Sequence, residues 1–148
     1  MANPVCELLK TREELERPLA APDASAGAVL DFRGVVRATE DGRIIRGIEY
    51  EAHPAMAEHQ LIVIAEQAIK RFRLTTAVIR HRTGFVGVGE ASLLVRVAAA
   101  HRQAAIDAMA WLIDELKNKV PIWKHPQFQA AQSHPAAKNL QLEEGVRK

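Results

Sequence analysis

Two long stretches of this sequence carry apolar residues at helical spacing, and each must bury one face against the rest of the chain. The first begins at Pro54, and proline is a favoured first residue of a helix. Its apolar face consists of Ala57, Leu61, Ile64, Ala65, Ala68, Ile69 and Phe72. The second runs from about Arg102 to Lys119 with the same periodicity. Both stretches therefore predict helices that pack on a common apolar surface.

Four shorter segments have the alternation that predicts β-strands, and together they can supply that surface. They cover residues 28–37, 44–51, 75–82 and 92–98. Gly34 predicts a bulge in the first strand, and Asp41-Gly42 predicts a turn that makes the second strand antiparallel to the first. The order strand, strand, helix, strand, strand, helix predicts a single α+β domain with a mainly antiparallel sheet and helices packed on it.

The predicted domain spans residues 27–125, between an N-terminal segment at 1–26 and a polar tail at 126–148. Thr11 and Glu14 have the spacing of a capping box, which predicts a short helix over residues 11–19. Prolines and small polar residues then predict a linker before residue 27. The tail is polar and has no strong apolar pattern.

Composition limits the classes of function. The 148 residues fit one domain, and a net charge of +2 argues against bulk binding of nucleic acid. Cys6 is the only cysteine, which excludes an intramolecular disulfide and favours a reducing compartment. The sequence has no signal-peptide pattern and no run of about 18 apolar residues, so we expect a cytoplasmic protein without membrane spans.

Several common kinds of catalytic site find no support. The six histidines form no closely spaced ligand pair, and one cysteine cannot complete a zinc site, so we expect no metal. The glycine cluster at 84–89 is followed by a strand pattern, whereas a dinucleotide-binding loop precedes a helix. We therefore expect a turn between strands at this cluster. No Gly-x-Ser-x-Gly nucleophile elbow occurs.

The strongest candidate for chemistry lies where the second helix ends. Pro121 cannot continue a helix, so Lys117 falls on the last turn and Lys124 on the segment beyond. The apolar Ile122 and Trp123 are expected to pin that segment against the core. Two ammonium groups on such a turn suit an anionic substrate, or a lysine whose lowered pKa makes it a base or nucleophile. The alternative is that both lysines complement the helix dipole and stay solvated.

Three further cationic residues stand at the ends of predicted elements. Arg37 ends the first strand, and His101 and Arg102 open the second helix, where cationic donors suit a phosphate. Ordinary solvated side chains are the alternative. His101 and Lys117 are sixteen residues apart, which is roughly 24 Å along a straight helix. Either the pair at 101–102 has a separate purpose, or two copies of the chain combine into composite sites in a homodimer.

Several short motifs, taken in their order and spacing, resemble the large, catalytic subunit of molybdopterin synthase over about residues 27–125. They are Gly27-Ala28-Val29 to Arg37, Ile48-Glu49-Tyr50-Glu51-Ala52, Met56-Ala57, His81-Arg82-Thr83-Gly84, Val88-Gly89-Glu90, Ala100-His101-Arg102, and Leu116-Lys117 through Val120-Pro121-Ile122-Trp123-Lys124. The resemblance implies an α/β hammerhead fold. It also implies a homodimer of large subunits with a small sulfur-carrier subunit at each end, which makes a heterotetramer.

The same resemblance implies an enzyme, a sulfurtransferase. The carrier subunit has a ubiquitin-like fold and ends in Gly-Gly, which is activated as a thiocarboxylate. Two sulfurs pass in succession to cyclic pyranopterin monophosphate and form the dithiolene of molybdopterin. The family needs no redox cofactor of its own for this reaction.

The family's functional residues carry over onto the cationic candidates. Lys117 matches the most directly catalytic lysine, expected to act as acid and base or to engage the carrier's carbonyl, with a pKa lowered by desolvation beside Ile113. Lys124 matches a second pocket lysine that stabilises an anion. Both lysines are also expected to bind substrate, together with a strand-end arginine and a histidine–arginine pair from the partner chain. These three residues are Arg37, His101 and Arg102.

The sequence departs from the family pattern at three places, one of which is that the C-terminal tail lacks the tryptophan often found there. Ala38 stands where an asparagine is common, and His125-Pro126 stands where charged residues are usual. Lys119 falls off the helix face of Lys117, so its part in the site is a separate question. A second hypothesis also fits the cationic residues: a binding module without catalysis that holds a phosphate ligand or an acidic protein tail.

Overall fold

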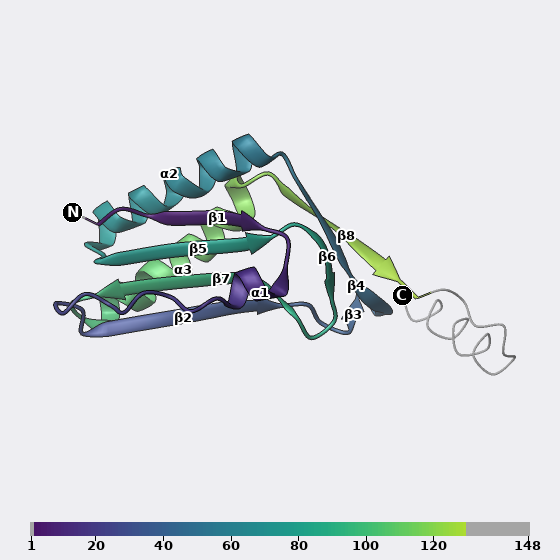
Figure 1. Ribbon diagram of the computed structural model, residues 1–148, viewed down its shortest axis with the longest axis horizontal. Helices are drawn as coiled ribbons and strands as arrows, with labels where there is room; N and C mark the ends of the chain where they lie inside the picture. Colours follow the sequence, from purple (N-terminus) through teal and green to yellow (C-terminus); the bar gives the residue numbers. More distant parts are fainter. Residues whose placement is uncertain (1, 130–148) are drawn as a thin grey trace, which may run out of the picture.

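The computed structural model describes residues 2–129, which form a four-stranded sheet with a second, smaller sheet at one end (Figure 1). The main sheet contains, in spatial order, β1 (Val5–Leu9), β5 (Thr76–Arg82), β7 (Ala91–Ala99) and β2 (Ala28–Val35). Neighbouring strands are antiparallel except for β1 and β5, which are parallel. The predicted α+β fold with a mainly antiparallel sheet is confirmed.

Both predicted long helices are present and pack on the same face of the main sheet (Figure 1). α2 (Pro54–Phe72) begins at the predicted proline, and α3 (Arg102–Lys119) ends two residues before Pro121. Their apolar stripes form one core with inward side chains of β5 and β7. Leu61 and Leu112 are fully buried there, and burial of such a side chain contributes about 2 kcal/mol. This core holds the two ends of α3 in fixed positions relative to the sheet.

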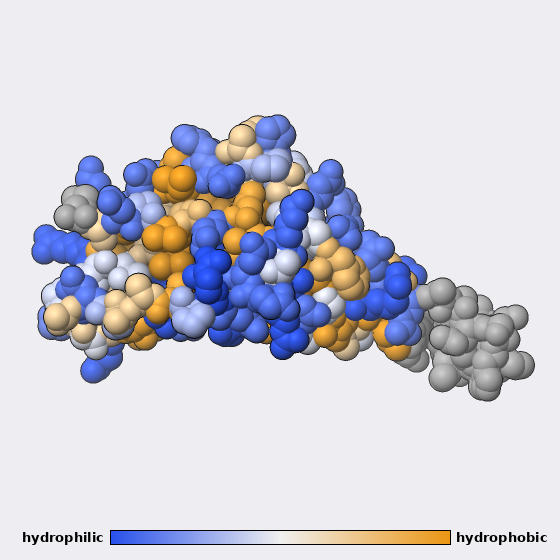
Figure 2. Space-filling model, in the orientation of Figure 1, coloured by the Kyte–Doolittle hydropathy of each residue, from blue (hydrophilic) through white to orange (hydrophobic). Residues whose placement is uncertain are grey.

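A short helix, α1 (Arg12–Glu16), covers part of the other face. The predicted capping box is confirmed, because Glu14 N donates to Thr11 Oγ1 at 3.1 Å and Thr11 N donates to Glu14 Oε1 at 3.1 Å. The helix is shorter than the predicted span of 11–19. The remainder of this sheet face is open, and Figure 2 shows apolar surface over the sheet beside hydrophilic surface over α1.

The second sheet is built around β4 (Arg43–Ala52), which pairs antiparallel with β3 (Thr39–Glu40), β6 (Gly84–Gly87) and β8 (Ile122–Phe128). The prediction that strand 44–51 pairs with strand 28–37 is therefore wrong. The predicted turn at Asp41-Gly42 exists, with positive φ at both residues, but it joins β3 to β4. The predicted bulge at Gly34 is also present, and beyond it the chain leaves the main sheet before that turn.

Four strands lack a clear signal in the sequence: β1, β3, β6 and β8. β8 contains Pro126 and pairs only with β4, so it is an edge strand, where a missing backbone N–H is tolerated. β1 brings the N-terminal segment into the main sheet, although the predicted domain began at residue 27. Residues 130–148 of the predicted tail lie outside the described part of the chain. No helix within residues 2–129 has the length and apolar character to cross a membrane.

Candidate functional site

The two candidate lysines lie on either side of the corner between α3 and β8. α3 ends with Val120, whose backbone N–H donates to Leu116 O at 3.2 Å, and β8 begins two residues later. Ile122 packs against both the main core and the core of the second sheet, so it pins the corner as predicted. Trp123 does not share this role, because half of it is exposed.

Lys117 projects from the last turn of α3 and is exposed. The desolvation expected for it beside Ile113 is therefore absent within this chain. Lys119 differs from Lys117 in its surroundings, since its Nζ lies 2.7 Å from Glu115 Oε1. At 3.6 residues per turn, positions 117 and 119 point to nearly opposite sides of the helix. The side chains of Lys117 and Lys119 therefore lie on different surfaces of the protein.

Lys124 stands opposite Tyr50 in the pairing of β8 with β4. Directly opposed residues of an antiparallel pair share one face, so Lys124 and Tyr50 lie on the same side of this sheet. Tyr50 is buried, and its ring meets the ring of His81 edge-on, with centroids 5.2 Å apart and an interplanar angle of 73°. Residues from β4, β5 and β8 thus meet beside the α3 corner.

His81 is held in one protonation state by its surroundings. Its Nδ1 lies 2.7 Å from the carbonyl oxygen of Arg82, and because a carbonyl only accepts, Nδ1 must carry the proton. The pKa of His81 is lowered from 6.5 to about 4, chiefly by burial, with the hydrogen bond to Arg82 opposing the shift and the positive charge of Lys124 adding to it. At neutral pH the imidazole is therefore neutral, and its Nε2 is an acceptor.

Arg37 is connected with the same cluster through its ion pair with Glu40. Arg37 Nη2 lies 3.5 Å from Glu40 Oε2, while 81% of the arginine side chain is exposed. Burial raises the pKa of Tyr50, a hydrogen bond with Ser92 opposes that rise, and the charge of Glu40 adds to it. Glu40 therefore pairs with the exposed guanidinium, and its charge also acts on the buried phenol.

His101 and Arg102 lie at the opposite end of α3 from Lys117. His101 is the N-cap residue and makes no side-chain capping bond, and both residues are exposed. The sixteen-residue separation noted in the sequence is thus realised in one continuous helix. A single chain brings Lys117 and Lys124 to one corner and leaves His101 and Arg102 at the far end.

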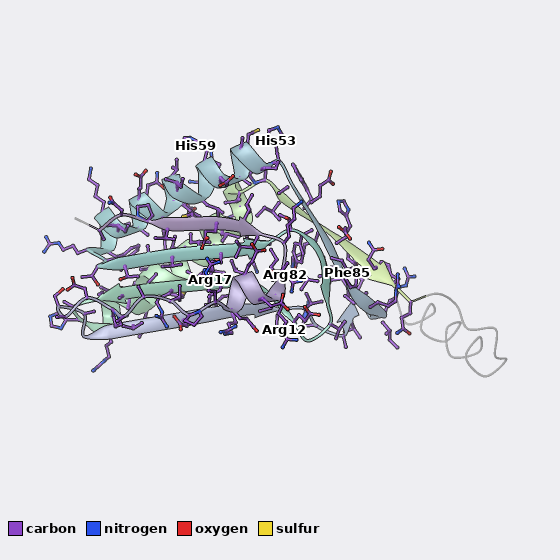
Figure 3. The ribbon with its side chains drawn as sticks, viewed as in Figure 1. Arg12, Arg17, His53, His59, Arg82 and Phe85 are labelled. Carbon is purple, nitrogen blue, oxygen red and sulfur yellow. The ribbon has the colours of Figure 1, made fainter. Side chains whose placement is uncertain are left out.

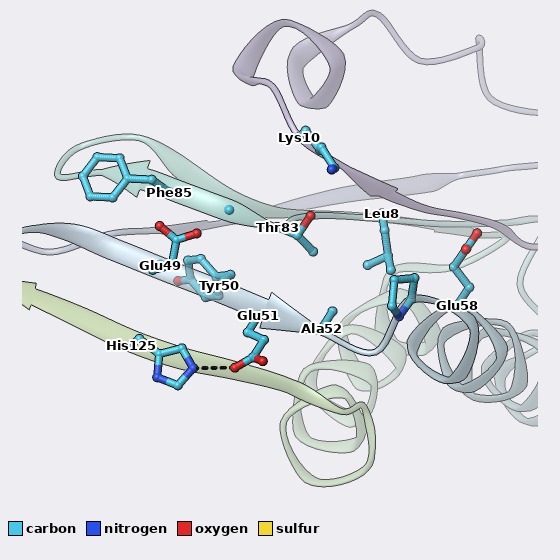
Figure 4. Close-up of a pocket in the computed structure, with 12 residues that line it drawn as sticks. Leu8, Lys10, Glu49, Tyr50, Glu51, Ala52, Glu58, Thr83, Phe85 and His125 are labelled. Atoms are coloured by element: carbon cyan, nitrogen blue, oxygen red, sulfur yellow. Dashed lines mark hydrogen bonds and ion pairs between the residues drawn. The ribbon is translucent and has the colours of Figure 1, made fainter.

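The structure also contains a pocket of about 790 Å³ next to this corner, between β1, β4, β6 and the start of α2 (Figure 4). Tyr50 lines it, as do the acidic Glu49, Glu51 and Glu58. His125 Nε2 lies 2.9 Å from Glu51 Oε1 on its wall. None of the five predicted site residues lines the pocket. The residue Tyr50 links the pocket to Lys124.

Other reactive groups do not add to this site. The thiol of Cys6 is half-buried, and burial together with Glu66 and Glu7 raises its pKa to about 12, so it stays protonated. No cluster of three or more potential metal ligands occurs within residues 2–129. The expectation of a turn at the glycine cluster is only partly right, because Gly84–Gly87 form β6 and pair with β4, and the turn is confined to Val88 and Gly89. Gly84, at the start of β6, and Gly89, in that turn, both have positive φ.

The sequence did not assign roles to Tyr50, His81, Ser92 or Glu40. Tyr50 and His81 occur in two of the motifs that carry the family resemblance, and this was the only available signal for them. Their contact joins strands of different sheets, and no local periodicity predicts such a contact.

Comparison with known proteins gives a consistent result. The family model described as MoaE protein matches residues 7–119. The chain is 41% identical to the molybdopterin synthase catalytic subunit of Thermoplasma volcanium, over 70% of this chain and 74% of that protein. It is 42% identical to the subunit of the same name from Pyrococcus abyssi, over 68% of each chain.

Solved structures agree. A chain of molybdopterin synthase from Staphylococcus aureus has a TM-score of 0.70 and 30% sequence identity, covering 90% of this chain and 97% of that one. A chain from the complex of subunits 1 and 2 of molybdopterin-converting factor of Helicobacter pylori has a TM-score of 0.63 at 24% identity, covering 88% and 93%. The second similarity concerns the fold alone.

Proposed function

The chain belongs to the MoaE family of molybdopterin synthase catalytic subunits, and we propose that Lys117 and Lys124 carry out its sulfur transfer. The donor is the C-terminal thiocarboxylate of a small ubiquitin-like carrier subunit, and the acceptor is cyclic pyranopterin monophosphate. Each transfer replaces a carbon–oxygen bond of the substrate by a carbon–sulfur bond, with the oxygen group leaving. It also breaks the carbon–sulfur bond of the carrier, whose acyl carbon gains an oxygen from water. Two transfers produce the dithiolene.

The observation that carries this proposal is the availability of positive charge. Within residues 2–129, no carboxylate pairs with Lys117, Lys124, His101 or Arg102, whereas Lys119 is neutralised by Glu115. An unpaired exposed ammonium group attracts an anionic substrate without first giving up an internal ion pair. The substrate's phosphate and the carrier's thiocarboxylate are both anions. These unpaired basic residues are therefore well suited to hold them, together with the exposed Arg37.

Each lysine has a distinct role in the proposal. Lys124 stabilises negative charge on the acyl group as the carbon–sulfur bond breaks, from a strand whose position is held by pairing with Tyr50. Lys117 supplies and accepts protons at the reacting carbon, or engages the carrier's carbonyl. Arg37 binds the phosphate, and the partner's His101 and Arg102 complete the anion site. No cofactor takes part.

The assembly in this proposal is a dimer of large subunits with one carrier subunit at each end, and its location is cytoplasmic. Support for a carrier comes from the Helicobacter pylori neighbour, which is a complex of two different subunits. The carrier's Gly-Gly terminus must reach the corner of α3 and β8.

A reconstituted assay with thiocarboxylated carrier and cyclic pyranopterin monophosphate tests the proposal. Lys117→Ala should reduce product formation by at least about 100-fold, as expected for loss of a group that transfers protons in the transition state. Lys119→Ala is the matched control, because it changes the same residue type in the same helical turn, and it should stay within about twofold. Full activity in Lys117→Ala would overturn the assignment, and equal losses in both variants would assign the effect to the helix end.

A further inference from the structure

A buried ion pair that the proposed chemistry does not use lies where the two sheets meet. Arg82 is the last residue of β5, and β6 begins two residues later in the second sheet (Figure 3). The arginine side chain is 7% exposed, and its Nη1 lies 2.8 Å from Glu90 Oε1. Among residues 2–129, Glu90 is the only carboxylate paired with this guanidinium. Because removal of one partner leaves the other as a buried, uncompensated charge, the pair holds the Glu90 side chain at the end of β5.

Glu90 directly follows the turn that joins β6 to β7, and several contacts fix the shape of this turn. Glu90 N donates to Gly87 O at 3.1 Å, and Gly89 within the turn has a φ of 86°. Val88 N donates to Arg46 O at 3.1 Å, which attaches the turn to β4. A Cβ added at Gly87 would lie 3.0 Å from Glu90 Oε2, so the carboxylate lies over the start of the turn. The ion pair with the buried guanidinium therefore helps to hold the whole turn in place.

The β6–β7 turn is bonded to Val36, the residue before Arg37. Val36 N donates to Glu90 O at 3.0 Å, and Gly89 N donates to Val36 O at 2.9 Å. Val36 is also buried in the core of the second sheet. Both polar groups of its backbone are therefore used in contacts with the turn and with Glu90. A continuous path of contacts runs from Arg82 through Glu90 to the residue that precedes Arg37.

Arg37 depends on this anchor because it has little support of its own. It lies in the link between β2 and β3 and belongs to no strand. Its side chain is mostly exposed, and its ion pair with Glu40 has a distance of 3.5 Å. After it, Ala38 O accepts a hydrogen bond from Ile45 N at 3.0 Å. The backbone contacts of Val36 and Ala38 therefore determine the point from which the guanidinium extends.

We propose that Arg82 and Glu90 are positioning residues of the sulfur transfer: their ion pair holds the β6–β7 turn, and the turn fixes Arg37 where it binds the substrate's phosphate. The role of Arg37 in this inference rests on the proposed function. The path of contacts from Arg82 to Val36 does not depend on that function. Neither positioning residue touches the substrate, so loss of their ion pair should weaken binding and leave the lysine chemistry unchanged.

Glu90→Gln tests the proposal in the assembled synthase, by steady-state kinetics with cyclic pyranopterin monophosphate. The amide keeps the size of the side chain and removes its charge. KM should rise about tenfold while kcat stays within about twofold, as expected when binding is lost and the chemical step is not. Glu7→Gln is the matched control, because Arg80 on the same strand is 5% exposed and pairs with Glu7 at 3.2 Å. It removes a similar ion pair that has no bond to Val36, and it should leave KM unchanged.

A double variant distinguishes positioning of Arg37 from a general loss of structure. Arg37→Ala should itself raise KM about tenfold, because it removes the phosphate contact. Adding Glu90→Gln to Arg37→Ala should raise KM by less than about twofold more, since a residue that acts only through Arg37 then has nothing to position.

Backbone hydrogen exchange of the full chain, followed by NMR, measures the positioning without the reaction. The amides of Val36 and Gly89 should exchange at least about tenfold faster in Glu90→Gln than in the wild type, and at the wild-type rate in Glu7→Gln. Gly87→Ala keeps both charges and pushes against the Glu90 carboxylate. It should raise KM and both exchange rates in the same direction, and it supplies the measurement if Glu90→Gln does not fold.

Any of four outcomes would overturn the proposal: an unchanged KM in Glu90→Gln, an equal rise in Glu7→Gln, additive losses in the double variant, or unchanged exchange at Val36 and Gly89. A fully active Lys117→Ala enzyme would instead overturn the proposed function. That result would leave the exchange rates expected for Glu90→Gln as they are. The two proposals therefore fail separately.

Discussion

Acidification should destabilise this protein through His81 in a pH range where most other groups do not change. Burial lowers the pKa of His81 from 6.5 to about 4. The unfolded chain therefore binds a proton between these values that the folded chain does not, and stability rises with pH across this window. The stabilisation is fully present above pH 6.5 and is lost as the pH falls toward 4.

The expected magnitude follows from these two pKa values. Between pH 7 and pH 5, the free energy of unfolding should fall by about 2 kcal/mol from His81 alone. Unfolded carboxylates are still mostly ionised at pH 5, so they add little in this range. Burial is the main cause of the pKa shift, and the charge of Lys124 adds to it. Protonation of His81 would place a second cation in the cluster beside that lysine.

Urea denaturation at pH 7 and pH 5 measures the effect. His81→Gln removes the titrating group and should reduce the difference between the two pH values to less than about 0.5 kcal/mol. His59→Gln is the matched control, because Figure 3 shows His59 on the outer side of α2, and the residue is exposed. This variant should retain the wild-type pH dependence. A flat wild-type profile, or an unchanged slope in His81→Gln, would refute the reasoning.

Three substitutions test how the fold holds its elements, each measured as a change in urea unfolding free energy at pH 7. Thr11→Ala removes the N-cap of α1 and should cost about 1 kcal/mol. Gly47→Ala should cost about 1–3 kcal/mol, since a Cβ there would meet the backbone oxygen of Val86; an unchanged stability would mean that β4 and β6 separate easily. Arg80→Ala should cost about 3 kcal/mol or more, because the buried guanidinium donates to Leu15 O and to Arg17 O and pairs with Glu7.

The helices were predictable because each is specified by its own sequence. Pro54 marks the start of α2 and Pro121 limits α3, and both apolar stripes follow the period of a buried helix face. The strands of the main sheet were predictable where they alternate or are uniformly apolar, as in β5 and β7. The strand β8 could not be predicted, since Lys124, His125 and Pro126 have the sequence character of a surface loop. Only the pairing with β4 makes this segment a strand.

Pairing between strands was harder to predict than the strands themselves. The turn at Asp41-Gly42 correctly predicted a hairpin, but it could not tell which preceding residues form its first arm. The bulge at Gly34 redirects the chain, so that β2 keeps β7 as its partner and the hairpin joins another sheet. A two-residue strand such as β3 carries too little pattern to be recognised in advance.

In the candidate site, too, some residues could be predicted from local sequence patterns and others could not. The cationic residues stand at helix and strand ends that local patterns locate, so Arg37, His101, Arg102, Lys117 and Lys124 could be named from the sequence. The buried groups beside them could not, because Tyr50 and His81 meet only when the two sheets pack together. The sequence did contain one constraint on assembly: the sixteen residues that separate His101 from Lys117 within one helix. A dimer that left the partner's His101 far from Arg37 would contradict the proposed composite site.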